Sequence, residues 1–385
     1  MEKNTMKKLF VCLFAVSMAL VLVGSAVAAD WSFYGSARMG TWWYANSDFE
    51  VPLADNVPGA MSSGTRDHSD LDLSHFLQSN ARIGANVTSG DVSGRFEYGA
   101  ADGKANIRIL RGTWSFGPGE LTVGQDYTPI SWTWYSNQVV NNDEGLLSLG
   151  LMYAGRKPML QFKYGGFKLA LISPNVVTSD GDAVHGVGYD TDVVIPKVEV
   201  AYRHSADNFF IDVGGGFQTY EYSDKNDESG TTLTSWVVGA GGGYNFGKGY
   251  AKLQLNYDVN GAAYGLARYA PEAVFTSKSD SAEDFTDPTR FGAAFSVGGQ
   301  INDMIDVELG VGMQQYINKQ SGYDLENTTY ALYLQFPFVP ASGVTITPEV
   351  GYMDWGNVEV ETPQEITKTD GGDTMYFGLY SRINF

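Results

Sequence analysis

The sequence predicts an all-β fold, a 16-stranded antiparallel transmembrane β-barrel with long loops at one end and short turns at the other. Three observations support this prediction. Apolar and polar residues alternate over segments of ten to fifteen residues, short connections alternate with long ones, and the chain ends on an alternating segment at Phe385.

The alternation has a period of two over most of the chain after residue 29. In residues 251–259, apolar residues at the odd positions alternate with Lys, Gln, Asn and Asp at the even positions. Because successive side chains of a strand point to opposite faces, each such segment has one apolar and one polar face. Strands of soluble proteins average about five to six residues, whereas the longer segments here suit tilted strands that cross a membrane.

The connections between the segments alternate in length. Short connections rich in Gly, Asn, Asp and Pro, which favour tight turns, lie at residues 89–91, 117–120, 165–166, 206–208, 247–249, 302–303 and 340–343. Long ones lie at residues 45–72, 126–156, 174–192, 222–231, 261–289, 317–326 and 357–372, and residues 101–104 form one short outward connection. Seven turns and eight outward loops join 16 strands, which is typical of barrels with periplasmic turns and extracellular loops.

Residues 1–29 have the features of a cleaved signal peptide. Lys7 and Lys8 precede an apolar run over residues 9–23, and small residues follow at positions 27–29. The apolar run is short for a membrane-spanning helix. We therefore expect residues 30–385 to form a single barrel domain that is exported to the bacterial outer membrane.

The composition excludes several classes of protein. Removing residues 1–29 takes away three lysines and one glutamate, which leaves a net charge of −21, and it removes Cys12, the one cysteine. A chain without cysteine has no disulfide scaffold, thiolate metal site or cysteine nucleophile. The acidic surplus argues against binding to nucleic acid, which requires cationic groups that neutralise phosphate.

Essentially all of the net negative charge falls in the long outward loops. Solvation of an exposed surface explains much of this charge. A sharper interpretation is that the loops loosely bind Ca²⁺ or Mg²⁺ and so bridge to anionic lipopolysaccharide. We expect no other cofactor and no dedicated metal site.

Both ends of the predicted strands carry further membrane signals. Trp42 and Trp43 lie near the long-loop end and Trp114 lies near the turn end, which matches the aromatic girdles of a membrane barrel. The terminal Phe385, at the end of an alternating strand, resembles the recognition signal of the barrel-assembly machinery.

Residues 112–158 resemble a strand–turn–strand unit of the trimeric porins of the Gram-negative outer membrane. The segment reads GTWSFGPGELTVGQDYTP from Gly112, and in those porins a glycine turn leads into a similar sequence. A weaker similarity to the organic-acid-specific trimeric porins lies at Gly124, Gln125, Arg156, Pro158 and Tyr164. The resemblance implies a homotrimer, and a third outward loop, at about residues 126–156, that folds into the barrel and narrows the pore.

Five arginines are predicted to form a basic wall inside the barrel, on strands that become adjacent when the barrel closes: Arg38, Arg82, Arg95, Arg111 and Arg382. Counting from the turn end puts the first four at similar heights and Arg382 lower. The parity of residues 106–116 is irregular, so Arg108 and Arg111 cannot both be placed inward. The alternative is that some arginines form structural pairs, for example Arg95 with Glu97.

The infolded loop offers acidic and aromatic candidates. The acids that we expect to face the basic wall are Asp126, Asp143 and Glu144. Opposed charges across a narrow pore create a transverse field that selects among solutes. Trp132, Trp134 and Tyr135 either form a stacking surface for solutes or, as we favour, pin the loop to the barrel wall.

These features favour a water-filled channel for passive diffusion of small hydrophilic solutes and ions. The alternatives are a selective channel for small organic anions and a structural or adhesive barrel. An enzyme is not expected, because none of the four histidines, His68, His75, His185 and His204, stands beside a recognisable catalytic motif.

Overall fold

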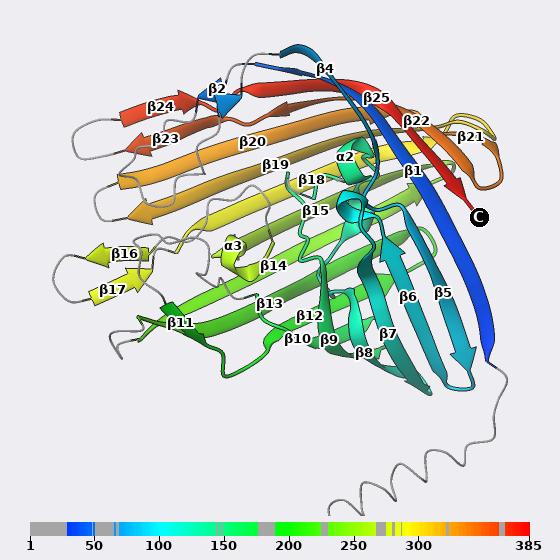
Figure 1. The fold of residues 1–385 in the computed structure, drawn as a ribbon, viewed down its shortest axis with the longest axis horizontal. Helices are drawn as coiled ribbons and strands as arrows, with labels where there is room; N and C mark the ends of the chain where they lie inside the picture. The colour runs from blue at the N-terminus through cyan, green and yellow to red at the C-terminus, as the bar shows by residue number, and fades with distance from the viewer. Residues whose placement is uncertain are drawn as a thin grey trace, which may run out of the picture.

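Antiparallel strands make up nearly the whole fold of the computed structural model (Figure 1). The structure describes residues 29–47, 49–50, 65–66, 69–143, 145–147, 149–175, 189–224, 230–266, 275–278, 282–285, 287–320, 323–361 and 366–385. Residues 1–28 of the predicted signal peptide therefore lie outside the described residues. Within those ranges, no helix has the length and apolarity needed to cross a membrane.

One large sheet contains most of the strands. Its members are β1 (Asp30–Asn46), β4 (Ser69–Leu77), β5 (Arg82–Ser89), β6 (Val92–Gly99), β7 (Asn106–Phe116), β8 (Gly119–Tyr127), β9 (Arg156–Tyr164), β10 (Phe167–Ile172), β11 (Tyr189–Asp192), β12 (Lys197–Ser205), β13 (Phe209–Asp224), β14 (Gly230–Phe246), β15 (Gly249–Val259), β18 (Thr289–Gln300), β19 (Asp306–Gln320), β20 (Tyr323–Gln335), β21 (Phe338–Ala341), β22 (Val344–Asp354), β23 (Asn357–Glu361), β24 (Ile366–Asp370) and β25 (Asp373–Asn384).

Short elements connect or accompany these strands. The helices are η1 (Ala101–Gly103), η2 (Thr133–Tyr135), α2 (Val140–Asp143) and α3 (Gly261–Tyr264). Two separate ribbons pair β2 (Phe49–Glu50) with β3 (Thr65–Arg66) and β16 (Phe275–Lys278) with β17 (Ala282–Phe285).

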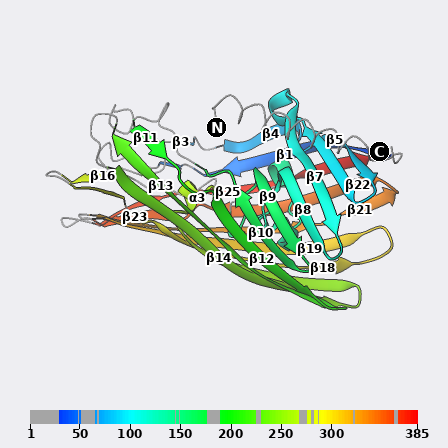
Figure 2. The same ribbon diagram turned by 90° about the horizontal axis from the view of Figure 1, so that it is seen from below.

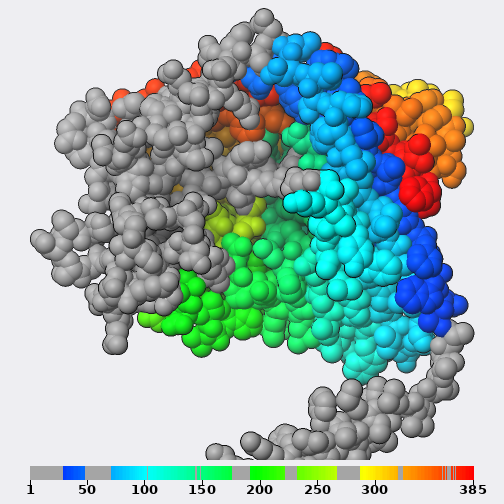
Figure 3. All heavy atoms as spheres, in the orientation of Figure 1, coloured from blue at the N-terminus to red at the C-terminus, as the bar shows by residue number. Residues whose placement is uncertain are grey.

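The sheet closes on itself where β1 pairs with β25, from Ser36 opposite Asn384 to Asn46 opposite Thr374. Strand fragments that continue one another are β4 with β5, β11 with β12, β20 with β21, β22 with β23, and β24 with β25. Counted in this way, the barrel has the predicted 16 strands. The space-filling view shows the blue first strand beside the red last strand along this seam (Figure 3).

The terminal residue takes part in closing the barrel. The Phe385 N–H donates to the Gly35 carbonyl at 3.0 Å, and the Gly35 N–H donates to the Phe385 carbonyl at 2.6 Å. A side chain at Gly35 would overlap the Phe385 ring. Phe385 therefore completes the ladder between the two ends of the chain, and its role as an assembly signal stays a prediction.

The barrel is apolar outside and polar inside. On β15, Leu253 and Leu255 are 47% and 42% exposed, whereas Gln254 and Asn256 between them are 0% and 3% exposed. The same pattern, which is inverted relative to that of a soluble protein, continues around the sheet. A barrel in lipid requires this arrangement.

Long and short connections lie at opposite ends of the barrel (Figures 1 and 2). The ribbons β16–β17 and β23–β24 extend from one end, and the turns β5–β6 and β21–β22 lie at the other. At this second end, Gly117 and Gly247 adopt left-handed φ angles of 61° and 59°, which glycine adopts at little cost. The predicted turns there are confirmed.

The described residues of three predicted outward loops are largely strand, which corrects the predictions for residues 222–231, 317–326 and 357–372. The ladders continue to Ser223 opposite Gly230 and to Gln320 opposite Tyr323, while β23 pairs with β24. Charged residues and residues typical of turns are frequent in these ranges, which favours loops. An antiparallel hairpin can nevertheless extend into water, because each backbone group still finds its partner across the ladder.

Trp42 does not join an outer aromatic girdle. Adjacent residues of a strand face opposite sides, and Trp43 stacks on Phe377 with ring centroids 5.3 Å apart, whereas Trp42 is fully buried in the interior against Tyr376. The prediction that both tryptophans lie at the membrane interface is wrong for Trp42.

Candidate functional site

The connection between β8 and β9 folds into the barrel, as predicted. Its elements contact strands on different sides of the barrel, because α2 lies against β1 and η2 lies against β15 and β18. Ile130, Leu151 and Met152 of this connection are fully buried. Because β8 ends at Tyr127 and β9 begins at Arg156, the constriction loop runs over residues 128–155. Asp126 lies on the wall and not in the loop, which corrects that assignment.

The aromatic residues of the loop pin it to β13. Asp212 of β13 accepts hydrogen bonds from Trp134 Nε1 at 3.0 Å and from the Tyr135 hydroxyl at 2.7 Å. The Arg203 guanidinium chelates the same carboxylate and lies 4.2 Å from the centre of the Trp134 ring. Trp132 and Tyr135 are buried, so this geometry corresponds to anchoring and not to an open stacking surface.

Two further carboxylates of the wall hold the loop backbone. Glu349 on β22 accepts hydrogen bonds from the N–H groups of Val139 and Val140 at 2.8 and 3.1 Å. Glu308 on β19 accepts one from the Asn137 N–H at 2.8 Å. Buried N–H groups need acceptors, and these acids supply them where the loop has no ladder of its own. Neither residue is among the predicted site residues, although the inward parity of both is a signal in the sequence.

Glycines on the same side of the barrel make room for the loop. A side chain at Gly241 of β14 would overlap the Tyr135 hydroxyl, and one at Gly312 of β19 would overlap the carbonyl oxygen of Leu149. Asn256 Nδ2 donates to the Gly150 carbonyl at 2.7 Å. We call the inward faces of β13, β14, β18 and β19 the glycine wall.

The opposite side of the interior carries the predicted arginines at two levels. Arg38 lies directly opposite Arg382, and Arg95 lies directly opposite Arg111. Arg82 pairs with Ser36 near the first level, whereas Arg95 pairs with Asn86. Four residues along β5 separate the levels, a distance of about 13 Å. Two predictions are therefore wrong: that Arg382 lies lower than Arg38, and that Arg38, Arg82, Arg95 and Arg111 all lie at similar heights.

Two of these guanidinium groups, together with that of Arg108, converge on one carboxylate. The fully buried Glu97 forms ion pairs with Arg82 at 3.3 Å, Arg95 at 2.8 Å and Arg108 at 2.8 Å. The Tyr34 hydroxyl also donates to Glu97 at 2.9 Å. The structural pairing between Arg95 and Glu97 is thus present, yet one negative charge among three positive ones leaves a net positive cluster.

A β-bulge resolves the irregular parity of β7. Glu97 is opposite Ile109 and Tyr98 is opposite Ile107, so Arg108 is an extra residue on β7. A bulge of this kind redirects side chains, and both Arg108 and Arg111 face the interior. Arg111 pairs with Asp126 at 2.6 Å.

Arg156, at the start of β9, completes the arginine side. Its Nη1 donates to the Tyr127 hydroxyl at 3.0 Å, and Arg108 Nη2 donates to the same oxygen at 3.2 Å. Among the described residues, neither Arg156 nor Arg382 forms an ion pair with a carboxylate; Arg382 Nη2 donates to Thr345 at 3.1 Å. We call the inward faces of β1, β5 to β9 and β25 the arginine wall.

No protein-family profile matches the chain, and no curated protein matches its sequence. Solved structures do match its fold. The outer membrane channel DcaP of Acinetobacter baumannii is 14% identical with a TM-score of 0.66, over 94% of this chain and 99% of that one. An anion-selective porin from Comamonas acidovorans is 11% identical with a TM-score of 0.55, over 93% and 100%. This chain has the porin fold. OmpF of Salmonella typhi, in complex with daunomycin, is also similar, at 12% identity and a TM-score of 0.51 over 92% and 97%.

The porin fold places one acid of the loop against the arginine wall. Asp143 of α2 forms an ion pair with Arg38. The break between β4 and β5 contacts the same turn, because Gln78 and Asn80 donate to the carbonyls of Asn141 and Asn142 at 2.6 and 2.8 Å. Glu144, the third predicted acid, lies outside the described residues.

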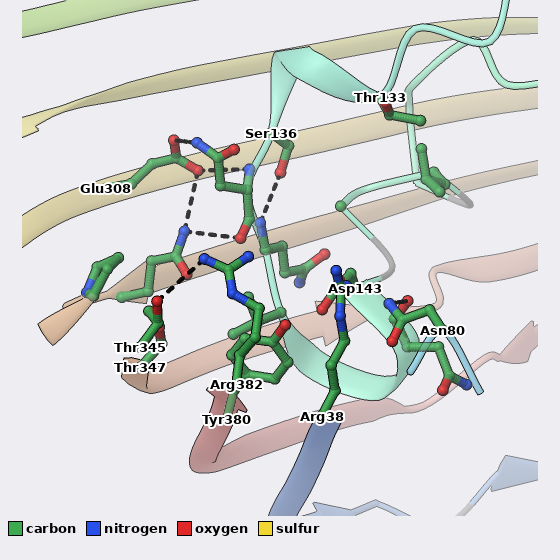
Figure 4. Close-up of a pocket in the computed structure, with 18 of the residues that line it drawn as sticks. Arg38, Asn80, Thr133, Ser136, Asp143, Glu308, Thr345, Thr347, Tyr380 and Arg382 are labelled. Atoms are coloured by element: carbon green, nitrogen blue, oxygen red, sulfur yellow. Dashed lines mark hydrogen bonds and ion pairs between the residues drawn. The ribbon is translucent and has the colours of Figure 1, made fainter. Parts of the chain in front are cut away.

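Between this loop and the arginine wall of the porin barrel lies a cavity of about 680 Å³. Figure 4 shows Arg38 and Arg382 on one side of it and Glu308 on the other. The cationic residues that line it are Arg38, Arg82, Arg108, Arg156, Lys248 and Arg382, and the anionic ones are Asp143, Asp306 and Glu308. Arg95 and Arg111 lie outside this lining, nearer the periplasmic turns.

The sequence predicts loosely bound divalent cations at the outward loops of the porin barrel. Within the described ranges, no group of three His, Cys, Asp or Glu residues is placed to hold a metal ion. Parts of the seven long loops, His68 and His185 among them, lie outside those ranges. His75 of β4 bonds to the Thr41 hydroxyl at 2.8 Å.

Proposed function

We propose that this chain forms a water-filled channel in the bacterial outer membrane through which small hydrophilic solutes and ions diffuse passively, with a preference for anions. The observation that carries the proposal is the composition of the 680 Å³ cavity, where cationic side chains outnumber anionic ones. Charged rings that line a pore select ions of the opposite sign.

The register of the arginine wall supports the anion preference. Arg38 and Arg382 lie directly opposite each other, and like charges at opposed positions destabilise a sheet. Asp143 forms a direct ion pair with Arg38, whereas Arg382 has no ion pair among the described residues. An arrangement that keeps such an arginine beside water is explained if anions pass along it.

A second candidate is a selective channel for small organic anions. Arg156 and Arg108 support it, because both guanidinium groups share the Tyr127 hydroxyl and both line the cavity. Guanidinium groups bind carboxylates in a bidentate geometry. A saturable, competitive current with small mono- and dicarboxylates favours this candidate, and a current linear in their concentration favours general diffusion.

The same proposal includes a homotrimer embedded in outer-membrane lipid and lipopolysaccharide, inserted by the barrel-assembly machinery, with Ca²⁺ or Mg²⁺ at the acidic outer loops and no enzymatic activity. OmpT of Vibrio cholerae, whose trimer form is similar to this chain at 13% identity and a TM-score of 0.57, supports the trimer. Light scattering of the purified protein with and without a chelator tests both the trimer and the cations.

Conductance of the purified, folded protein in planar bilayers tests the channel. We expect stepwise currents, and a reversal potential in a salt gradient that indicates anion preference. Arg156→Ala and Arg382→Ala should each lower the anion-to-cation permeability ratio by about twofold, whereas Arg95→Ala, outside the cavity lining, should change it less. Folded protein that passes no current excludes the channel.

A further inference from the structure

A second inward segment lies beside the constriction loop. The chain leaves β15 at Val259 and forms the single turn α3, with Asn260 and Gly265 in left-handed conformations at φ 55° and 90°. Asn260 Nδ2 donates to the Thr234 carbonyl and to Asp287, each at 2.8 Å. The prediction of an outward loop over residues 261–289 is therefore wrong for its first part, since α3 packs on β14 and Leu266 lines the cavity.

Tyr264 fills a slot in the wall that is built for it. A side chain at Gly216 of β13 would overlap the Tyr264 hydroxyl. Glu199 of β12 lies directly opposite Gly216 and accepts a hydrogen bond from that hydroxyl at 3.0 Å. Lys197 Nζ lies 4.2 Å from the centre of the Tyr264 ring and donates to the Tyr264 carbonyl at 3.2 Å.

The backbone carbonyl groups of the segment are also satisfied by the wall. The Ala263 carbonyl accepts hydrogen bonds from Gln218 Nε2 at 3.2 Å and from Asn175 Nδ2 at 3.1 Å. Gln218, Lys197 and Tyr264 are fully buried or nearly so. A loop that merely lay over the barrel mouth would leave these groups to water, so the segment has a defined, anchored position.

Both inward segments share their anchors. Along the inward face of β13, Asp212 and Gly214 contact Trp134 and Trp132 of the constriction loop, and Gly216 and Gln218 then contact the segment around α3. Glu199 joins the two, because it accepts hydrogen bonds from the Ile130 N–H at 3.3 Å and from Tyr264.

We infer that residues 260–266 form a second constriction element, which Tyr264 locks into the glycine wall, and that Glu199 couples it to the constriction loop. The cross-section open to solutes is then set by two segments, and not by the loop over residues 128–155 alone. This inference rests on the proposed channel function and adds a pore-size determinant to it.

Releasing Tyr264 from its slot beside Gly216 should widen the pore. Tyr264→Ala removes the ring, and Gly216→Val overfills its slot. Each should raise the single-channel conductance by about 1.5-fold, because the current grows with the open cross-section, and should admit larger neutral polymers. Tyr264→Phe, which loses only the hydrogen bond to Glu199, should give a smaller increase. Tyr202→Ala removes an exposed tyrosine from the outward face of β12, and this matched control should leave both values unchanged.

Thiol labelling tests, without a current measurement, whether Tyr264 holds residues 260–266 in place. Ala263→Cys introduces a single thiol into the exported chain, because Cys12 belongs to residues 1–29. This buried thiol should resist a maleimide reagent in folded barrels and react at least about tenfold faster when Gly216→Val is added, since reactivity follows access. Migration of unheated samples on gels verifies that each variant is folded.

The outcomes separate the two ideas. A wild-type protein without conductance overturns the proposed function and, with it, the control of pore size. If the wild type conducts, unchanged conductance and polymer cutoff in folded Tyr264→Ala and Gly216→Val overturn the second constriction. Equal rates of maleimide labelling with and without Gly216→Val overturn the claim that Tyr264 holds residues 260–266 in the glycine wall.

Discussion

The two walls of the interior show opposite ways of using the inward positions of a strand. The arginine wall fills several of them with long cationic side chains, most of which line a cavity, and Glu97 is the common partner of three of these. The glycine wall has glycines at several of them, among them Gly216, Gly241 and Gly312, and two loop segments occupy the space instead. The arginine wall contributes charge to the pore, and the glycine wall, through the loop segments it holds, determines the shape of the opening.

The difference also explains the distribution of buried acids. Asp212, Glu308 and Glu349 lie on the side of the loop and accept its hydrogen bonds. Of the three, Glu308 alone belongs to the cavity lining, so they add less to the potential of the cavity than their number suggests. The comparison makes four predictions, of which the first has the largest expected effect.

Removing the common partner should destabilise the arginine wall most. Glu97→Ala leaves Arg82, Arg95 and Arg108 without their carboxylate, and breaking a buried pair costs about 3–5 kcal/mol. Urea titration of the folded barrel in lipid measures the loss. Glu120→Ala, which breaks a half-exposed pair with Lys163, is the control and should cost about 0–1 kcal/mol. Equal losses in the two variants would contradict the convergence on Glu97.

Filling the glycine wall should displace the loop. Gly312→Val places a side chain where the Leu149 carbonyl lies, and overpacking of this kind costs about 1–3 kcal/mol. We expect a lower urea midpoint and a larger, noisier single-channel current. Gly112→Ala has open space around it and should change neither. A wild-type current in folded Gly312→Val would show that the loop does not rest on this wall.

Removing one wall acid that holds the loop should weaken the anchoring of the loop by a smaller amount. Glu349→Ala deprives the Val139 and Val140 N–H groups of their acceptor, and each unsatisfied buried group costs about 1–3 kcal/mol unless water replaces the partner. Hydrogen exchange of these two amides should accelerate. Glu349→Gln keeps one acceptor oxygen and should have an intermediate effect; exchange rates that match the wild type in both variants would rule out the anchor.

Removing one charge of the arginine wall should alter selectivity and hardly alter stability. Arg382→Ala relieves the repulsion with Arg38, a gain of about 0.2–1 kcal/mol, and it removes a cation from the cavity lining. The reversal potential should shift toward cations most clearly at low salt, where screening is weak. A loss of stability with unchanged selectivity would assign Arg382 a structural role.

Much of the fold could be predicted from local patterns. Alternation, turn residues and Phe385 identify the strands, their count and the closing seam, because a strand in lipid must be apolar on one face and each turn needs its own residue types. The hairpins beyond the membrane escaped prediction, because water imposes no apolar face on them. The inward position of Arg108 also escaped, since the bulge in β7 depends on the register of its partner strand.

By itself, the amino-acid sequence determined the barrel, the inward arginines of β1, β5 and β6, and the approximate place of the long connection between β8 and β9. Each of these follows from parity and spacing along one segment. Only the tertiary structure decided that three arginines share Glu97, that Asp126 belongs to the wall, and that residues 260–266 also fold inward. Those features depend on strands that meet across the barrel, and no period along the chain encodes which buried partner a side chain will find.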